Sequence, residues 1–360
     1  MKTLLKKKNL ADYATYAGVI LAFIIVTVLS QQGMLKRSWM SWLVPICSYV
    51  VMAVSLNLTV GILGELSLGH AGFMSVGAFS GVIAAMSLVD TIPSAGIRLA
   101  VAVVVGAVFA GITGVIVGVP VLRLKGDYLA IVTLAFGEII KELINCLIVG
   151  HDSAGLHMIF NYKGTKSVDD LHLLEDGVVI VKGAQGTAGV QTLSTFAAGV
   201  ILILITLFIV LNLVRSRSGR AIMAIRDNQI AAESVGINIT KYKMMAFVTS
   251  AFLAGMAGAL FGLNYSTVTA SKFKFDTSIL VLVFVVLGGI GNIRGSVIAA
   301  ALLTVLPELL RACADYRMLV YAVVLIAVML ATNSPALRSA LSRVIPHRRH
   351  ANVKKEGESA

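Results

Sequence analysis

Long apolar runs recur along almost the whole chain, separated by short polar or glycine-rich segments. A helix needs about 20 apolar residues to cross a bilayer, and a segment in lipid must satisfy its own backbone polar groups. The sequence therefore predicts an all-α, polytopic integral membrane protein with about ten transmembrane helices, some of them broken or re-entrant. The runs lie at residues 13–30, 42–60, 71–89, 98–119, 128–149, 194–214, 243–264, 278–290, 296–312 and 318–332.

Composition excludes the main alternatives. Hydrophobic residues make up 58% of the 360 residues and charged residues only 13%, against roughly 25% charged in soluble domains. A soluble globule of this size could not bury so much apolar surface, and a disordered chain would have the opposite balance. The net charge is +12, but basic and aromatic residues do not alternate as on a nucleic-acid surface, so we expect no nucleic-acid partner.

The basic residues predict how the chain sits in the membrane. With alternating spans, most Lys and Arg fall on one side, although Lys36 and Arg37 fall on the other, so we expect both termini to be cytoplasmic. The expected organisation is a basic cytoplasmic N-terminus (1–12), a transmembrane domain (13–335) and a basic cytoplasmic tail (336–360). The first run could instead be a signal peptide, but a retained span agrees better with the membrane-like sequence downstream.

Two polar segments stand out between the spans. Residues 150–193 form the long insert, which faces outward in this topology and is either a docking platform or a tolerated loop. Residues 215–243 form a cytoplasmic loop. Within it, Ile222, Ile225, Ala232 and Val235 recur at helical spacing, which predicts one amphipathic helix that starts at Ser218 and ends at Gly236. Such a helix can lie on anionic lipid or insert into the groove of a partner protein.

Two glycine-rich breaks interrupt the apolar runs, at residues 61–72 and 288–295. Paired interruptions in the two halves of a chain are typical of transporters with an internal repeat; the alternative is close helix packing through small residues, as expected for Gly77 and Gly81. In the first break a hydroxyl and free amides could meet a carboxylate, although Glu65 would oppose it. The break residues proposed to line a path are Gly64, Ser67, Gly69, His70, Gly288 and Gly289.

Glu138 is the acidic residue nearest the middle of an expected span. A charge at that depth costs roughly 2.5–3.5 kcal/mol on insertion scales unless it is paired or hydrated. Either Glu138 lines the solute path or a subunit interface, or it forms a local pair with Lys141 at i+3. The polar Asn57 and Asn264 fit the commoner role of hydrogen bonding between helices.

Catalytic and metal-binding signatures are missing from the sequence. It contains no GxxxxGK[ST] phosphate loop, no HExxH and no GxSxG elbow. Its six histidines are scattered, and its three cysteines lack ligand spacing. We therefore expect a protein that is not an enzyme and that holds no metal.

Four segments carry a resemblance to a known family. They are residues 56–73, 125–140, 216–260 and 287–310, in the family's order within residues 45–330. Together they resemble the permease subunits of bacterial branched-chain amino acid ABC transporters. The Lys-Gly-Asp-Tyr segment at residues 125–128 is similar to that of the larger of the two permease types.

The resemblance implies a fold, a function and a set of partners. It implies an importer in the bacterial inner membrane for leucine, isoleucine or valine, with a second permease, two cytoplasmic ATPases and a periplasmic binding protein. ATP would be bound by the ATPases, and no cofactor by this chain. The 218–236 helix would be the coupling helix, although its Asp227-Asn228-Gln229 run has fewer acidic residues than the family commonly shows. Its implied contact residues are Gly219, Arg220, Ala224, Arg226, Asp227, Glu233 and Gly236.

Other functions remain open at this stage. A related importer could carry urea, amides or other amino acids, because selectivity can lie in the binding protein. A stand-alone secondary carrier or channel would need an ion-coupling site or a conductive pore, and Glu138 is the residue that suggests one. An intramembrane enzyme has little support, since no nucleophile and base converge.

Overall fold

A computed structural model describes residues 2–32, 37–124, 126–153, 155–161, 168–174 and 177–309, with four single positions between 319 and 326. The chain divides into two compact units, residues 1–305 and 306–360. All elements except the last turn of α11 belong to the first unit. The expected tail at 336–360 lies outside the described residues, as does most of the expected run at 318–332.

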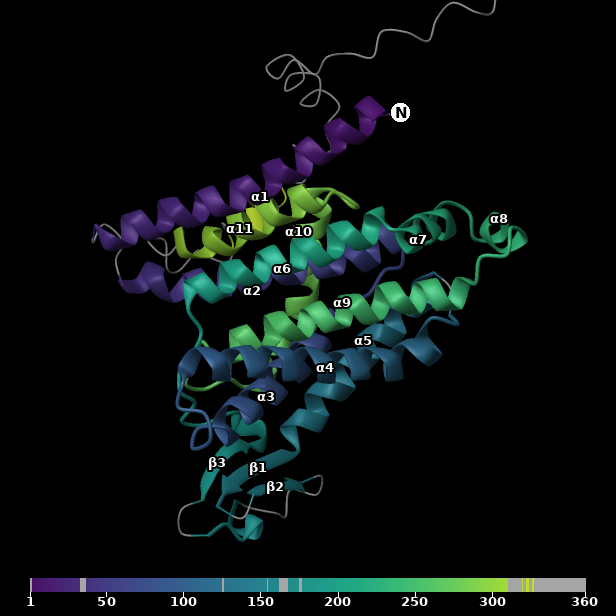
Figure 1. Cartoon of the computed structure of the whole chain (residues 1–360). Helices are drawn as coiled ribbons and strands as arrows, with labels where there is room; N and C mark the ends of the chain where they lie inside the picture. Colours follow the sequence, from purple (N-terminus) through teal and green to yellow (C-terminus); the bar gives the residue numbers. More distant parts are fainter. Residues whose placement is uncertain are drawn as a thin grey trace, which may run out of the picture. The chain divides into compact units, whose positions relative to one another are not determined.

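Helices dominate the first unit (Figure 1). The α-helices are α1 (Lys2–Gln31), α2 (Arg37–Asn57), α3 (His70–Ser87), α4 (Ala95–Val121), α5 (Asp127–Asn145), α6 (Phe196–Arg215), α7 (Arg217–Asp227), α8 (Gln229–Ser234), α9 (Ile239–Gly262), α10 (Phe275–Gly288) and α11 (Ile293–Leu309). One π-helix, η1 (Leu58–Leu63), continues α2, and short 3₁₀ turns are η2 (Val168–Leu171), η3 (Gly183–Gln185) and η4 (Ala270–Phe273). The strands are β1 (Leu147–Asp152), β2 (Gly155–Phe160) and β3 (Val178–Lys182).

Five helical segments among the described residues are long and apolar enough to cross a membrane. They are Trp39–Leu63, His70–Ser87, Ala95–Val121, Phe196–Arg215 and Ile239–Gly262, and two shorter apolar helices cover Thr15–Ser30 and Phe275–Gly288. The chain is therefore a polytopic helical membrane protein, as the sequence predicts. The expected count of about ten spans is not confirmed.

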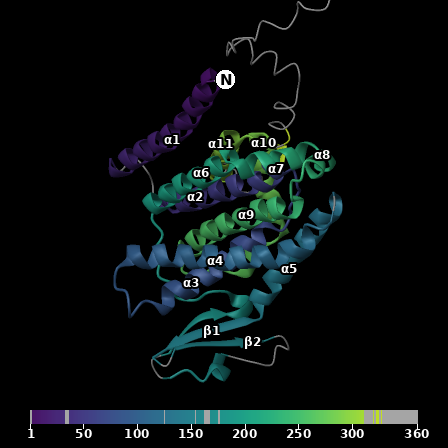
Figure 2. The same cartoon turned by 45° about the vertical axis from the view of Figure 1, so that its right-hand side comes forward.

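Helices α3, α4 and α9 pack side by side as the core of the bundle (Figures 1 and 2). Small residues allow their backbones to touch: a Cβ on Gly77 of α3 would lie 2.2 Å from the carbonyl oxygen of Gly255, and one on Gly258 of α9 would lie 2.0 Å from that of Met74. Close approach through small residues is the usual way in which membrane helices associate. Helix α2 also packs on α9, and α6 packs on α2.

The polar insert between α5 and α6 corrects the expectation of an all-α chain. Strands β1, β2 and β3 form an antiparallel sheet in the order β2-β1-β3. The expected span at 128–149 is wrong at its end, because α5 stops at Asn145 and Leu147 begins a strand. A short apolar run does not distinguish a helix from a buried strand by periodicity alone, and the strands that pair with β1 supply the decisive hydrogen bonds.

Helix α9 connects the two polar regions of the unit. Its 24 residues span about 36 Å. Beyond its C-terminal end, the main chain at Ser266 and Val268 accepts hydrogen bonds from Val190 and Thr187, which follow the sheet. Its N-terminal part contacts η1, α7 and α8. The sheet and the α7–α8 segment are thus attached to opposite ends of one helix.

Candidate functional site

The first glycine-rich break follows a change in helix type. Helix α2 ends at Asn57, and η1 continues it as six π-helical residues, all of them buried. Gly64 ends η1 in the left-handed conformation (φ +82°), and the next amide, that of Glu65, donates to the carbonyl of Thr59. π-helical turns are uncommon and occur frequently at functional sites. We define the first break as residues 61–69, from Gly61 in the last turn of η1 to the residue before α3.

The second break separates α10 from α11. Helix α10 ends at Gly288, and Gly289 (φ +92°) and Gly291 (φ +80°) both adopt positive φ, which favours glycine. We define it as residues 289–292. A Cβ on Gly288 would lie 2.4 Å from the amide nitrogen of Ser296, so α10 and α11 meet closely at this turn.

The structure brings the two breaks into contact. Asn57 accepts a hydrogen bond from the amide of Gly291 (2.9 Å) and donates one to the hydroxyl of Ser296 (2.9 Å). A Cβ on Gly61 would lie 2.3 Å from the nitrogen of Gly291. Asn57 is fully buried, so its amide fastens η1 to the second break, in the bridging role that the sequence favours.

The segment at 215–243 contains two short helices, α7 and α8, rather than the predicted one. Ser216, not Ser218, caps α7, by accepting from the amide of Gly219 (3.1 Å). Asn228 takes an extended conformation and caps α8 by accepting from the amide of Ala231 (3.0 Å). Asparagine competes with helix hydrogen bonds in this way and favours caps over helix interiors.

The end of α8 agrees with the sequence analysis. Gly236 has φ +83°. Its amide donates to the carbonyl of Glu233, and the next amide, that of Ile237, donates to the carbonyl of Ala232. This pair of bonds is the Schellman arrangement that ends helices at glycine.

The predicted apolar face is correct at three positions of four. Ile222, Ile225 and Ala232 are buried, but Val235 is 75% exposed because it lies in the turn that ends α8. Ile230, at the start of α8, is 82% exposed. The segment therefore packs one apolar side on the unit and presents two apolar side chains to its surroundings.

Arg226 joins this segment to the first break. Its Nη1 donates to the carbonyl of Gly61 (3.0 Å), 165 residues away in sequence, and its guanidinium also pairs with Asp227 (2.9 Å). A Cβ on Gly64 would lie 2.6 Å from Cγ of Arg226. The arginine stem thus lies against the glycine that ends η1.

The other predicted contact residues have local surroundings. Gly219 is buried against the end of α6, where a Cβ would lie 2.2 Å from the carbonyl oxygen of Leu213. Arg220 is exposed and donates to the carbonyl of Arg215 (3.3 Å). Ala224 is half-buried, and Glu233 is exposed.

Sequence analysis missed a second attachment of the same segment. Lys243, in α9, forms an ion pair with Glu65 of the first break, and its Nζ lies 3.5 Å from the side-chain oxygen of Gln229 in α8. The side chains of Lys243 and Glu65 are only 5% and 15% exposed. The available signal was a lone acid in a glycine-rich break and a lysine at the start of an apolar helix.

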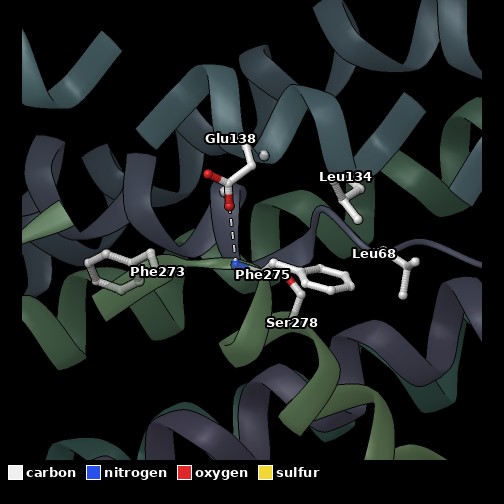
Figure 3. A pocket seen from close by; sticks show the side chains of 8 residues that line it. Leu68, Leu134, Glu138, Phe273, Phe275 and Ser278 are labelled. Carbon is white, nitrogen blue, oxygen red and sulfur yellow. Dashed lines mark hydrogen bonds between the residues drawn. The ribbon is translucent and has the colours of Figure 1, made fainter. Parts of the chain in front are cut away.

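Glu138 lies at the opposite end of the first break, on α5. One of its oxygens pairs with Lys141, which also contacts Glu142 (3.1 Å). The other accepts from the amide of Phe275 (3.3 Å) at the start of α10, as Figure 3 shows. The local pair expected as one alternative is therefore present, and it is combined with a contact between helices.

A small hollow lies beside Glu138, with room for little more than a water molecule. Figure 3 shows that its wall is largely apolar. The lining residues are Leu68, Gly72, Leu134, Gly137, Glu138, Phe273, Phe275 and Ser278.

The remaining path candidates are buried where α3 begins. Ser67 is buried, and its hydroxyl has no partner among the described residues. A Cβ on Gly69 would lie 1.9 Å from the carbonyl oxygen of Thr133 on α5. The ring of His70 is buried, with Nε2 2.7 Å from the hydroxyl of Ser55. Within the described part of the chain, His, Cys, Asp and Glu form no cluster suited to a metal.

These features define a class: a polytopic helical membrane protein with broken helices and a short polar segment attached to one break. The family model described as "Branched-chain amino acid transport system / permease component" matches residues 38–330. The chain belongs to this family of transport permease components.

Individual relatives agree with the family assignment. The chain is 33% identical over 293 residues to the high-affinity branched-chain amino acid transport system permease protein LivM of Salmonella typhimurium and to that of Escherichia coli K12, covering 78% of this chain. It spans 66% of the length of each of these relatives, just under two thirds. Similarity to the permease protein LivH of Salmonella typhimurium is 23% identity over 79% of this chain and 89% of that protein.

Proposed function

We propose that this chain is a permease subunit of an ATP-driven ABC importer for leucine, isoleucine and valine. It works with a second permease, two cytoplasmic ATPases and a periplasmic binding protein. It lies in the bacterial inner membrane with both termini in the cytoplasm. The family match and the names of the LivM and LivH relatives support the transport class and the pairing of two permeases.

One observation carries the coupling part of the proposal. The α7–α8 segment exposes Ile230 and Val235 at one end, while Arg226 attaches the segment to the π-helical carbonyl of Gly61. Exposed apolar side chains on a short helix are suited to a groove in a partner protein. The segment is therefore equipped to touch an ATPase on one side and the broken helix on the other.

The proposed mechanism uses this chain's own contacts. ATP binds to the partner ATPases and not to this chain, and closure of the ATPases displaces α7 and α8. The displacement reaches the breaks through the contact residues, which are Gly219, Arg220, Ala224, Arg226, Asp227, Glu233 and Gly236. The solute passes beside the breaks, along Gly64, Ser67, Gly69, His70, Glu138, Gly288 and Gly289. Alternating access then requires two arrangements of the same bundle, populated differently with and without ATP.

The experiment is reconstitution of the purified complex in proteoliposomes. The complex is isolated through a tag on this chain in mild detergent, and uptake of radiolabelled leucine is measured with and without ATP. We expect both ATPase subunits and a second permease to co-purify, and uptake to require ATP and the binding protein. Recovery of the chain alone, with uptake driven by an ion gradient, would contradict the proposal.

A variant tests whether the α7–α8 segment contacts the ATPases. Ile230→Ser should release the ATPases from the complex at least tenfold more readily without reducing the yield of folded chain. Leu174→Ser is the matched control, since Leu174 is 53% exposed on the polar insert. Equal retention of the ATPases in both variants would show that Ile230 does not contribute to the interface with the ATPases.

The rival carrier hypothesis has less support in the structure. Glu138 is the main candidate for an ion-coupling site, but its carboxylate is already paired with Lys141 and accepts a hydrogen bond from the amide of Phe275. Within the importer class, the substrate can be determined by competition. Unlabelled urea, amides and other amino acids are added in turn, and the reduction in labelled leucine uptake is measured.

A further inference from the structure

Lys243 occupies a point where three elements meet. It belongs to α9, it pairs with Glu65 of the first break, and its Nζ lies near the amide oxygen of Gln229 in α8. Glu65 and Lys243 are 178 residues apart in sequence. Neither belongs to the predicted contact set, and both side chains are largely shielded from solvent.

Because this pair is buried, it resists separation more strongly than a surface pair does. Two charges shielded from water attract each other more strongly than exposed charges do. Removing one partner leaves the other buried and uncompensated, which strongly disfavours separation. A displacement of α8 and the start of α9 therefore pulls Glu65 with it more readily than it opens the pair.

The two attachments of the α7–α8 segment divide the first break between them. Arg226 holds the π-helical side, at the carbonyl of Gly61. Lys243 holds Glu65, the residue just after Gly64, where the left-handed turn ends the π-helix. Contacts on both sides of one glycine are suited to turning the chain about that glycine.

We propose that the buried Glu65–Lys243 ion pair is the linkage that makes the first break follow the α7–α8 segment. Both are positioning residues: they touch neither ATP nor solute, and they convert movement of the segment into movement of residues 61–69. The inference rests on the proposed function for its transport readout, but the linkage itself can be measured without transport.

A purely structural role makes a different prediction from a linkage. If the pair only stabilised the fold, then Glu65→Gln and Lys243→Gln would reduce uptake and ATP hydrolysis in proportion to the loss of intact complex. If the pair transmits movement, the intact complex that remains would still hydrolyse ATP but would transport poorly. The number of solute molecules carried per ATP separates the two roles.

The test compares variants in proteoliposomes at equal amounts of assembled complex. We expect Glu65→Gln and Lys243→Gln each to lower the leucine-to-ATP ratio at least tenfold, with ATP hydrolysis within twofold of wild type. The exchange Glu65→Lys with Lys243→Glu should restore the ratio to within threefold, because it restores the pair. Lys241→Gln, at an exposed lysine of the same helix, is the matched control and should leave the ratio unchanged.

A second readout needs no transported solute. Leu66→Cys, in a chain whose three native cysteines are replaced by alanine, reports on the break through its rate of labelling by a water-soluble maleimide. We expect a non-hydrolysable ATP analogue to change this rate at least threefold in the assembled complex, and to have no effect once Glu65→Gln is added.

The two readouts distinguish failure of the linkage from failure of the proposed function. A wild-type complex that carries no leucine but shows the ATP-dependent labelling change would overturn the substrate and keep the linkage. Parallel loss of uptake and hydrolysis in the single variants, or a labelling change that persists without Glu65, would overturn the linkage.

Discussion

The two glycine-rich breaks touch each other, yet they are held by different chemistry. The first break is held by charged side chains, through the Glu65–Lys243 pair and the guanidinium of Arg226. The second is held by neutral groups, through the side-chain amides of Asn57 and Asn292 and through direct glycine contacts. In the proposed mechanism, the charged contacts with the α7–α8 segment and α9 would let the first break respond to a partner. The second break would then be the fixed support against which the first moves.

The point where the breaks meet should be the most sensitive to substitution. A side chain at Gly61 would overlap both Asn57 and the backbone of Gly291, and backbone atoms cannot move aside cheaply. Gly61→Val should therefore lower the free energy of unfolding by about 4 kcal/mol or more, measured from the denaturant midpoint in mixed micelles. Gly96→Ala, with open space around its Cβ position, is the control. Similar losses of stability in the two variants would show that the contact between the two breaks does not stabilise the fold.

The second largest effect is expected when the first break loses the charge that pairs with Glu65. Lys243→Gln leaves Glu65 buried without its partner, so we expect a loss of about 3 kcal/mol in the free energy of unfolding. Adding Glu65→Gln to the same chain removes the isolated charge and should recover most of that loss while leaving transport uncoupled from ATP hydrolysis. If the double variant regained both its stability and its coupling of transport to ATP hydrolysis, the charged pair would not be what makes the first break differ from the second.

The neutral attachment of the second break should matter less. Asn57→Ala leaves the amide of Gly291 without its side-chain partner, whereas the hydroxyl of Ser296 keeps its bond to the carbonyl of Asn292. An unsatisfied buried group costs on the order of 1–3 kcal/mol. We expect a loss of about 2 kcal/mol, with the ratio of solute carried to ATP hydrolysed unchanged. Asn212→Ala, at an exposed asparagine of α6, serves as the control. A changed ratio would show that the second break also moves.

The smallest effect is expected at the exposed ion pair beside the first break. Asp227 is 68% exposed where it pairs with Arg226, and exposed pairs contribute roughly 0.2–1 kcal/mol. Asp227→Asn should change the denaturant midpoint little, and less still at high salt. A loss as large as that of Lys243→Gln would mean that Asp227 is needed to hold Arg226 on the carbonyl of Gly61.

The sequence was informative where a local pattern decides the structure. The apolar runs predict most of the long helices in the described part of the chain, the glycines mark both breaks, and Gly236 is correctly expected to end a helix. It was misleading where short-range patterns compete. Asn228 divides the predicted single helix because its side chain caps α8, and the end of the run at 128–149 becomes a strand because its partners lie elsewhere in the chain.

Contacts between distant residues account for most of what the sequence could not reveal. From the sequence, Glu65 is only an obstacle to an anionic solute, since nothing local indicates a lysine 178 residues away as its partner. The bond from Arg226 to the carbonyl of Gly61 involves a backbone atom, which carries no residue-specific signal. Pairings of this kind depend on how the helices pack, and a single sequence does not encode that packing in any local pattern.

Helix α9 links two polar regions that are far apart in the sequence. At one end, Lys243 contacts Glu65 and Gln229, and just beyond Gly262 the chain is bonded to residues that follow the sheet. If the chain is the importer subunit proposed above, coupling between these two ends must be reciprocal. A binding protein that docks at the sheet would then alter the surroundings of Glu65, just as an ATPase that displaces α8 would alter the sheet.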